Sequence, residues 1–261
     1  MARPLTCDVA VIGGSFAGVA AALAAAESGA IVILTEALPW IGGQVTSQGV
    51  APLDEHRLVE TVHATRRYED FRSKVRAFYQ QQYGAPVVMA DGKPLNPGNG
   101  WVSALCFEPV VGLQVLQEML ALHIASGRLQ VLLNAVPIGC EGDPTHITAV
   151  NVKTEDGIVA IRAQYFLDAT DTGELLPLAG LRYVTGAEAQ EDTDEEFASA
   201  DGAHPERIQS FTYCFVVEFC PGENHVIEKP AGYEDNRDKQ PYSLTLYDRS
   251  GVAKPFHFFK A

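Results

Sequence analysis

The stretch that most constrains the fold lies near the start of the chain, at residues 8–36. The apolar, β-branched run at 9–12 predicts a buried parallel strand, which ends at a Gly-Gly-Ser turn. The alanine-rich run at 17–28 predicts a helix without bulky side chains, so this helix can lie close against a sheet. A glycine ends it, and the run at 30–35 predicts a second buried strand with Glu36 at its carboxyl end. The stretch therefore predicts a complete β-α-β unit.

The turn in this unit predicts a dinucleotide site. A tight glycine turn lets a pyrophosphate approach the backbone, and the helix that follows directs N–H groups and its positive dipole end at that charge. The spacing is that of G-x-G-x-x-G, with Gly13 first, Gly18 third and Ser15 in place of the second glycine. Glu36 is placed to accept hydrogen bonds from ribose hydroxyls. The alternative interpretation is an alanine-rich core helix that binds nothing.

Length and composition set the broad class. The 261 residues allow one large domain or two small ones, and the 47% hydrophobic content is ample for a core. The net charge of −14 and the pI near 4.8 argue against nucleic acid or an anionic membrane as the main partner, because both are bound by clustered cations. Residues 9–26 are uncharged, but glycines interrupt them and the β-α-β unit explains them better than a signal or membrane segment. We therefore expect a cytoplasmic protein.

The cysteines give no sign of a metal site. They form no C-x-x-C pair and have no His-rich neighbourhood, so we expect no metal. An odd number of cysteines fits buried free thiols in a reducing compartment. The five are Cys7, Cys106, Cys140, Cys214 and Cys220.

A second glycine pair follows Glu36. Gly42 and Gly43 precede Gln44, Thr46 and further small polar residues, which together make a loop with little bulk. Such a loop suits a large polar ligand that lies across it. A solvated connection between sheet and helix is the alternative.

These segments together resemble a known family. VIGGSFAG, the acid Glu36, IGGQVTSQGV and the later YFLDATDTGELLPLAG resemble the FAD-dependent oxidoreductases with a glutathione-reductase-like, Rossmann FAD-binding domain. More narrowly, the chain is similar to a loosely characterised family of FAD-dependent oxidoreductases with GGQ-x-T-S-Q and LNPGNGWVS-like segments. The likeness runs from about Asp8 to the end. It implies an α/β fold, a parallel sheet with a β-meander, plus an incomplete, inserted α+β substrate domain.

The resemblance also implies FAD as the cofactor and a set of contacts to it. The first turn would hold the pyrophosphate, Glu36 the adenosine ribose, and the second glycine loop would run toward the flavin. A strand at 128–136 would present Val136 to the adenine. A second signature would follow the strand that ends at residue 168, with Asp171 where related proteins have glycine; likewise, Gln44 stands where they often have arginine. The implied contacts are Gly13, Gly14, Ser15, Phe16, Ala17, Gly18, Glu36, Gly42, Gly43, Gln44, Thr46, Val136, Ala169 and Thr170.

The remaining chain alternates between periodic and irregular segments. Helical spacing predicts a long helix at about 54–83, whose basic residues either meet an anionic substrate or pair with acids. An irregular loop at 90–109 precedes a helix that Pro109 opens and Gly127 stops. Beyond it we expect a hairpin at 147–153 and 158–164, a solvated acidic loop at 188–201, and strands at 211–219 and 243–247.

These segments predict two domains. We expect an FAD-binding domain at 1–180 with a helical or cap insertion at about 52–108, followed at 181–261 by the start of a substrate domain. Related flavoproteins return to the FAD domain after the substrate domain, and no such segment is visible. Together with the aromatic run FHFFKA at the end, this predicts the amino-terminal portion of a longer protein.

The predicted activity is transfer of a hydride equivalent from a small or medium organic substrate to flavin, with a nearby base taking the proton. His56 and Glu108 are the candidate bases, with Cys106 as a third. His56 also fits an ordinary histidine at a helix start, and Glu108 a helix cap. Two other hypotheses stay open: a non-catalytic or partner-dependent dinucleotide-binding module, and an adenine-nucleotide enzyme resembling the thiazole-forming synthases. A homo-oligomer is compatible with all three.

Overall fold

The computed structural model describes residues 3–50, 52–62, 64–100, 102–143, 145–209, 211, 214–218, 220–239, 245–247 and 250–255. The chain divides into two compact units, 1–215 and 216–261. The domain boundary expected near residue 180 stays a prediction.

A parallel sheet organises the first unit. Its order is β4-β3-β2-β8, and every neighbouring pair is parallel. The β-α-β prediction is confirmed, because helix α1 (Phe16–Glu27) connects two neighbouring strands of this sheet. The strands are β2 (Val9–Ile12), β3 (Val32–Thr35), β4 (Leu129–Leu132) and β8 (Tyr165–Asp168).

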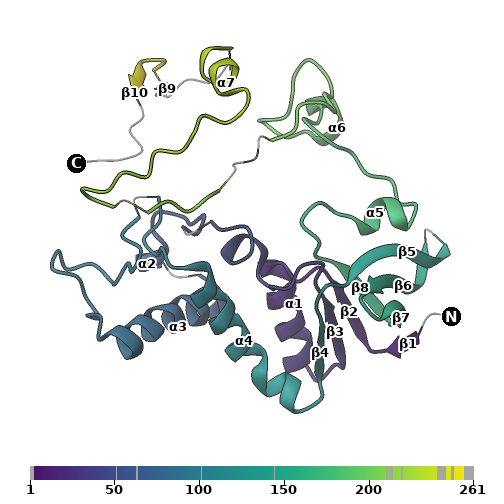
Figure 1. Ribbon diagram of the computed structural model, residues 1–261. Helices are drawn as coiled ribbons and strands as arrows, with labels where there is room; N and C mark the ends of the chain where they lie inside the picture. Colours follow the sequence, from purple (N-terminus) through teal and green to yellow (C-terminus); the bar gives the residue numbers. More distant parts are fainter. Residues whose placement is uncertain are drawn as a thin grey trace. The chain divides into compact units, whose positions relative to one another are not determined.

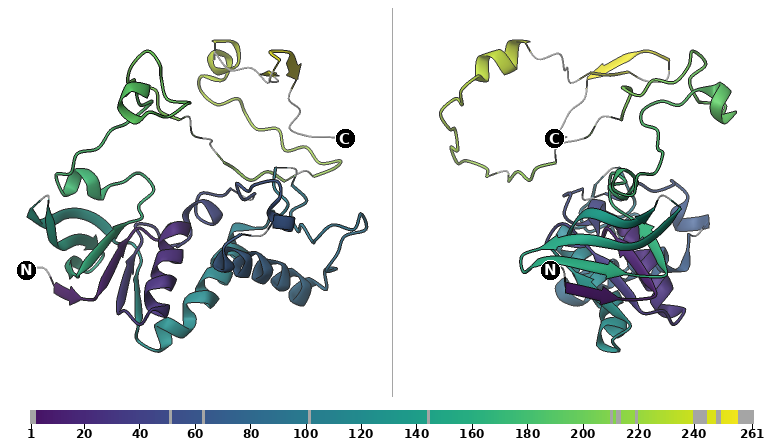
Figure 2. Two further views of the ribbon diagram at one scale, coloured as in Figure 1. Left: turned by 180° about the vertical axis from the view of Figure 1, so that it is seen from behind. Right: turned by 90° about the vertical axis from the view of Figure 1, so that its right-hand side faces the viewer.

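Alternate residues of the central strands face two separate cores. Val11 and Leu34 pack with α1 and with α4 (Pro109–Ala125), while Ile12 and Ile33 pack with a second sheet on the other side. Figures 1 and 2 show the parallel sheet between these layers. A strand buried on both faces explains why residues 9–12 are apolar without alternation.

The second sheet has the order β1-β7-β6-β5. The predicted hairpin is confirmed, because β6 (His146–Thr154) and β7 (Gly157–Arg162) pair antiparallel. The sequence did not predict β1 (Arg3–Thr6) as a strand, nor β5 (Val136–Asp143) as separate from β4. The single strand expected at 128–136 is therefore wrong: it ends at Leu132, and Asn134, with a φ of 51°, turns the chain toward the second sheet.

The long helix expected at about 54–83 is only partly correct. Residues 54–58 are not helical, and two helices follow, the short α2 (Val59–Val62) and α3 (Arg66–Tyr83). Thr65 has extended backbone angles, and the N–H of Ala64 donates to the Glu69 carboxylate, so a new helix start forms there. The predicted helix after Pro109 and its stop at Gly127, with a φ of 72°, are confirmed.

The later part of the first unit is less regular. Two short helices follow β8, α5 (Leu175–Leu178) and α6 (Gln190–Thr193). The latter lies inside the segment expected to be an acidic loop, where Ala189 also forms a bridge with Ser199. The strand expected at 211–219 is wrong for the residues that are described there, 211 and 214–218, which form no strand.

The second unit contains α7 (Tyr233–Lys239) and an antiparallel pair, β9 (Thr245–Tyr247) with β10 (Ala253–Pro255). The expected strand at 243–247 is found for its last three residues, and 243–244 and the aromatic run at 256–261 lie outside the described residues. Among the helices of the described chain, none is long and apolar enough to cross a membrane.

The expectation of buried thiols holds for two of the five cysteines. Cys7 and Cys106 are buried, Cys140 and Cys220 are half-buried, and Cys214 is exposed. Burial raises the pKa of the Cys7 thiol to about 11, so this thiol stays protonated at neutral pH.

Candidate dinucleotide site and adjoining cavity

The first turn of α1 sits directly on the peptide that ends β2. Gly13 has a φ of 102°, and a Cβ at this position would overlap the backbone of Ala169 at the end of β8. A Cβ on Gly18 would overlap the carbonyl oxygen of Gly13 and stand 3.2 Å from Cβ of Ala169. Both positions therefore require glycine, because backbone approaches backbone there.

Ser15 takes over the role of a helix cap. Its Oγ accepts a hydrogen bond from the N–H of Gly18 at 3.1 Å and donates one to the carbonyl of Ala169 at 2.7 Å. The N–H of Ala17 has no acceptor in the described part of the chain, and that of Phe16 has only the loose contact with the Gly42 carbonyl that belongs to the parallel bridge between Ser15 and Gly42. These two amides, at the positive end of α1, are the groups that an anion can bind.

The side chain of Phe16 does not take part in such a site. Its ring packs against Tyr68 and Phe71 of α3, with ring centroids 5.9 and 5.0 Å away. Only its backbone N–H is available to a ligand.

Glu36 lies at the carboxyl end of β3 with 9% of its surface exposed. Its Oε2 accepts from the N–H of Gly14 at 2.9 Å and its Oε1 from the N–H of Leu38 at 2.8 Å. Burial raises the pKa of this carboxyl group, and the nearby Asp171 adds to the shift. A carboxylate has about four acceptor positions. The backbone N–H of Ala37 also acts on this carboxylate, and the acceptor positions that remain can serve ribose hydroxyls.

The second glycine loop lies beside the first. The N–H of Gly42 donates to the carbonyl of Gly14 at 2.6 Å, and Gly43, in the 3-10 turn η1 (Gly43–Val45), stands next to Ser15. Gln44 is exposed, and its Nε2 donates to Asp54 at 3.0 Å. Thr46 is 1% exposed, and its hydroxyl donates to the carbonyl of Ile41, so this side chain holds the loop together.

The loop after β8 is held by its own hydrogen bonds. Asp168 accepts from the N–H of Thr170 at 3.0 Å, from its hydroxyl at 2.6 Å and from the N–H of Leu175 at 3.1 Å. The Thr170 hydroxyl in turn accepts from the N–H of Glu174 at 2.9 Å. This Asx-type loop brings the Ala169 backbone against Gly13.

The carboxyl ends of β2, β3 and β8 surround a cavity of about 110 Å³. Six predicted contacts line it: Gly13, Ser15, Glu36, Val136, Ala169 and Thr170. Thr35 also lines the cavity, and its hydroxyl accepts from the N–H of Gly13 at 3.3 Å. It is not among the residues predicted from the sequence, although a polar residue directly before Glu36 at the end of a buried strand indicates such a role. The described residues that line this cavity include neither Lys nor Arg, so an anion bound there would be met only by backbone N–H groups and the α1 dipole.

A larger cavity of about 780 Å³ lies in the segment at 55–104. His56, Arg57, Lys93, Asn96 and Ser103 are among its lining residues. The hydrogen bond between Gln44 and Asp54 ties this segment to the second glycine loop.

A buried charge network forms one wall of this cavity. Arg72 of α3, with 5% of its side chain exposed, forms ion pairs with Glu55 and Glu60, and Arg76 pairs with Glu60. Glu55 also accepts from the Tyr68 hydroxyl at 2.7 Å and from Ser103 at 2.9 Å. Burial lowers the pKa of Arg72 to about 10 and raises that of Tyr68 to about 12.

Most of the basic residues at 54–83 form ion pairs with acidic residues. Arg66 and Arg67 pair with Glu27, Lys74 with Asp70, and the buried arginines with Glu55 and Glu60. Arg57 has no ion-pair partner among the described residues, which leaves it as the cation of this cavity without a counterion.

The two candidate bases lie in different surroundings. His56 lines the larger cavity, and its Nδ1 accepts from the N–H of Leu58 at 3.3 Å. Glu108 occupies the N-cap position of α4 without a capping hydrogen bond, and its carboxylate accepts from the Tyr79 hydroxyl. It lines neither cavity. Cys106 is buried, and its backbone N–H donates to Asn96 at 2.7 Å. A catalytic role for each stays a prediction.

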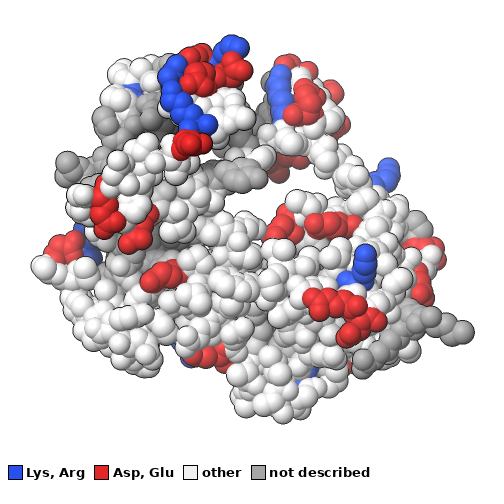
Figure 3. Space-filling model, viewed as in Figure 1, with Lys and Arg blue, Asp and Glu red and all other residues white. Residues whose placement is uncertain are grey.

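The surface charge agrees with the composition. Acidic side chains are spread over the face seen in Figure 3, and fewer basic ones interrupt them. Among the described residues this face presents no basic patch of the kind that binds a phosphate backbone.

Comparison with known proteins identifies a family. Residues 8–257 match the family described as FAD dependent oxidoreductase, which is nearly the whole chain. No curated protein matches the chain.

Solved structures with similar folds include Mycobacterium smegmatis Sdh1 in complex with UQ1, at 15% identity and a TM-score of 0.43, over 63% of this chain and 33% of that one. A geranylgeranyl bacteriochlorophyll reductase-like protein from Thermoplasma acidophilum shares 22% identity with a TM-score of 0.42, over 69% and 43%. L-proline dehydrogenase from P. horikoshii shares 16% with a TM-score of 0.36, over 72% and 25%. The chain thus spans less than half of each of these proteins, and likenesses this distant carry no argument about function.

Proposed function

Because the chain belongs to the FAD dependent oxidoreductase family, whose cofactor is FAD, we propose that the strand ends around the smaller cavity, those of β2, β3 and β8, together with the first turn of α1 bind the adenosine diphosphate half of FAD. One observation carries this proposal: Gly13, Glu36 and Ala169, from three separate strand ends, line the same small cavity. The amides of Phe16 and Ala17 bind the pyrophosphate, and Glu36 accepts hydrogen bonds from the ribose. Val136, at the start of β5, contacts the adenine.

The glutathione-reductase-like arrangement belongs to this proposal as well. The second glycine loop lies against the first turn, so a ligand that extends from the pyrophosphate passes Gly43 before it reaches the segment after Asp54. The larger cavity in that segment then receives the substrate. The volume of about 780 Å³ suits a small or medium organic molecule.

The charge of this cavity favours an anionic substrate. Its buried acids Glu55 and Glu60 are neutralised by arginines behind them, and Asp91 pairs with Lys93 at 2.7 Å. Arg57 is left to attract a carboxylate or a similar anion.

His56 orients the substrate by a hydrogen bond and accepts the substrate proton. FAD supplies the redox chemistry by accepting a hydride equivalent. The hydrogen bond from Leu58 to Nδ1 places the proton of a neutral His56 ring on Nε2, so this nitrogen donates to the substrate. To act as the base, the ring gives up the 3.3 Å hydrogen bond and accepts the substrate proton at Nδ1.

The test is the visible absorption of the purified chain after incubation with FAD and gel filtration. We expect a flavin band that elutes with the protein and is bleached under anaerobic conditions by an oxidisable organic acid. A folded, colourless chain would contradict the proposal, and a covalently altered adenylated product on the protein would favour the thiazole-synthase hypothesis.

A variant pair tests the assigned role of His56. His56→Ala should retain flavin and lose turnover, while His123→Ala, at a half-buried histidine in the last turn of α4 that lines neither cavity, should retain both. Unchanged turnover in His56→Ala would remove this residue from the mechanism.

A further inference from the structure

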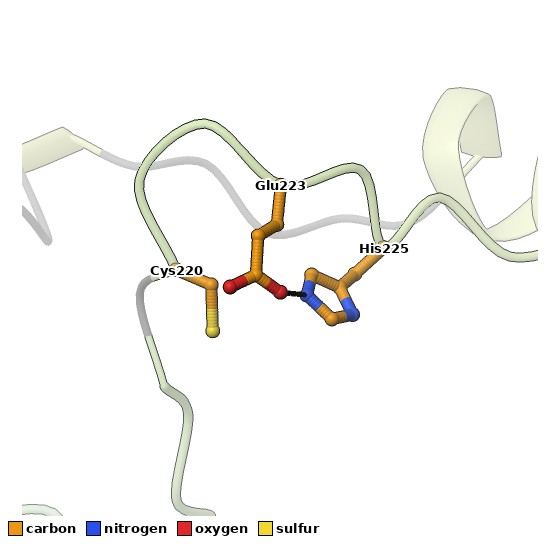
Figure 4. Close-up of side chains that lie close together, drawn as sticks. All are labelled: Cys220, Glu223 and His225. Carbon is orange, nitrogen blue, oxygen red and sulfur yellow. Dashed lines mark hydrogen bonds and ion pairs between the residues drawn. The ribbon is translucent and has the colours of Figure 1, made fainter.

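Three side chains with metal-binding atoms converge in the second unit. Cys220, Glu223 and His225 belong to one loop, and their Sγ, carboxylate oxygen and imidazole nitrogen lie within 4.8 Å of one another. Figure 4 shows the Glu223 carboxylate between the thiol and the imidazole ring. Its Oε2 and Nε2 of His225 form a hydrogen bond of 2.8 Å. None of the three residues lines either of the two cavities described above.

The local sequence explains why they converge. Pro221 and Gly222 form a turn in which the N–H of Glu223 donates to the carbonyl of Cys220 at 3.3 Å, and Gly222 has a φ of 80°. Proline followed by a residue with positive φ is the pattern of a type II turn, whose first and last residues lie close together. Asn224 then accepts from the N–H of Val226 at 3.1 Å, which holds the backbone around His225. The turn and the Asn224 hydrogen bond thus hold the thiol, the carboxylate and the imidazole close together before any metal binds.

The donor set selects a class of metal. A thiolate, a carboxylate and a neutral imidazole carry two negative charges together, which balance a divalent cation. Zn²⁺ binds all three donor types at about 2.0–2.3 Å, usually with tetrahedral geometry, and hard cations such as Ca²⁺ and Mg²⁺ take oxygen ligands instead. Ligand atoms around such an ion stand about 3.3–3.8 Å apart. Side-chain rotations reach that spacing by moving Glu223 and His225 apart from their 2.8 Å contact and by closing the wider distances, which are at most 4.8 Å.

We propose that Cys220, Glu223 and His225 bind Zn²⁺. The hydrogen bond between Glu223 and His225 opens when the ion enters between them, and Cys220 loses its thiol proton to solvent. Glu223 and His225 keep about two thirds of their side-chain surface exposed, so water occupies the fourth position. The sequence pattern C-x-x-E-x-H holds neither a cysteine pair nor a histidine cluster, and for this reason the sequence alone predicts no metal.

Cobalt titration tests this site directly. The full chain, reduced and freed of metal, is titrated with Co²⁺ and followed by difference absorption spectra, in which any flavin contribution cancels. We expect a thiolate-to-cobalt band in the near ultraviolet, visible bands of tetrahedral intensity, and loss of both when Zn²⁺ is added.

Variants assign the ligands. Cys220→Ser should abolish the thiolate band, and His225→Asn should weaken the apparent Co²⁺ affinity at least about tenfold. Two matched controls should leave the spectra unchanged: Cys214→Ser, which removes an exposed thiol, and His204→Asn, which removes a histidine near Asp201 and Glu206. The proposal is wrong if no thiolate band forms, if the band survives Cys220→Ser, or if Cys214→Ser removes it.

Discussion

Replacing Gly18 by alanine should lower both the stability of the chain and its affinity for FAD. In an ordinary helix, glycine to alanine stabilises by up to about 1 kcal/mol. Here the added Cβ would fall well inside the 3.0 Å that real Cβ atoms keep, against the carbonyl oxygen of Gly13 and within 3.2 Å of Cβ of Ala169. The atoms it meets are mostly backbone, so α1 and the end of β2 must separate by about 1 Å.

The size of both effects follows from this separation. Overpacking of a rigid contact costs about 1–3 kcal/mol, which lowers the melting temperature of a chain of this size by roughly 2–12 °C. The amides of Phe16 and Ala17 move with the first turn of α1. Losing one hydrogen bond to a charged phosphate costs about 1.5–3 kcal/mol, which is a roughly 10- to 150-fold loss of affinity.

The assay combines thermal unfolding, followed by circular dichroism, with titration of FAD fluorescence. Gly139→Ala is the matched control, because a Cβ on Gly139 in β5 meets nothing within 4 Å. If Gly18→Ala melts at the temperature of this control and binds FAD equally well, the assigned contact between α1 and Gly13 is wrong.

Two further predictions concern buried carboxyl groups. Glu55→Gln should destabilise the chain by about 2–4 kcal/mol in denaturant unfolding, because Arg72 keeps its buried charge with Glu60 alone; an unchanged midpoint would contradict the network. The pKa of Glu36 is raised above 4.5 in the folded chain, so FAD affinity should fall as the pH drops through that raised value. Over the same pH range the folded state takes up a proton that the unfolded state does not, so the ligand-free chain should gain stability relative to Glu36→Gln. A pH profile identical in Glu36→Gln would exclude this role.

The sequence predicts the β-α-β unit well because local chemistry determines it. Gly13, Gly18 and Glu36 belong to one β-α-β unit, whose strand, turn and helix follow from short-range propensities. The position of Ala169 beside Gly13 depends on pairing across more than 150 residues, and only the resemblance to a family suggested it.

Other features depend on contacts that no local pattern encodes. The helix expected at 54–83 is divided between α2 and α3, and the ion pairs of Arg72 and Arg76 with Glu55 and Glu60 join α3 to the residues before the break. Strand β1 is short and only half apolar, and it is a strand because β7 pairs with it. The hydrogen bond from the Tyr79 hydroxyl to Glu108 joins α3 to α4, and the two residues are far apart in the sequence.

The central claim is that the described residues bind the adenosine diphosphate half of FAD, and competition at equilibrium tests it most directly. The chain is saturated with FAD, whose fluorescence is followed while ADP or FMN is added in separate titrations. We expect that ADP displaces FAD and that FMN, which lacks the adenosine, does not at the same concentration. Displacement by FMN as effective as that by ADP, or no displacement by ADP, would contradict it.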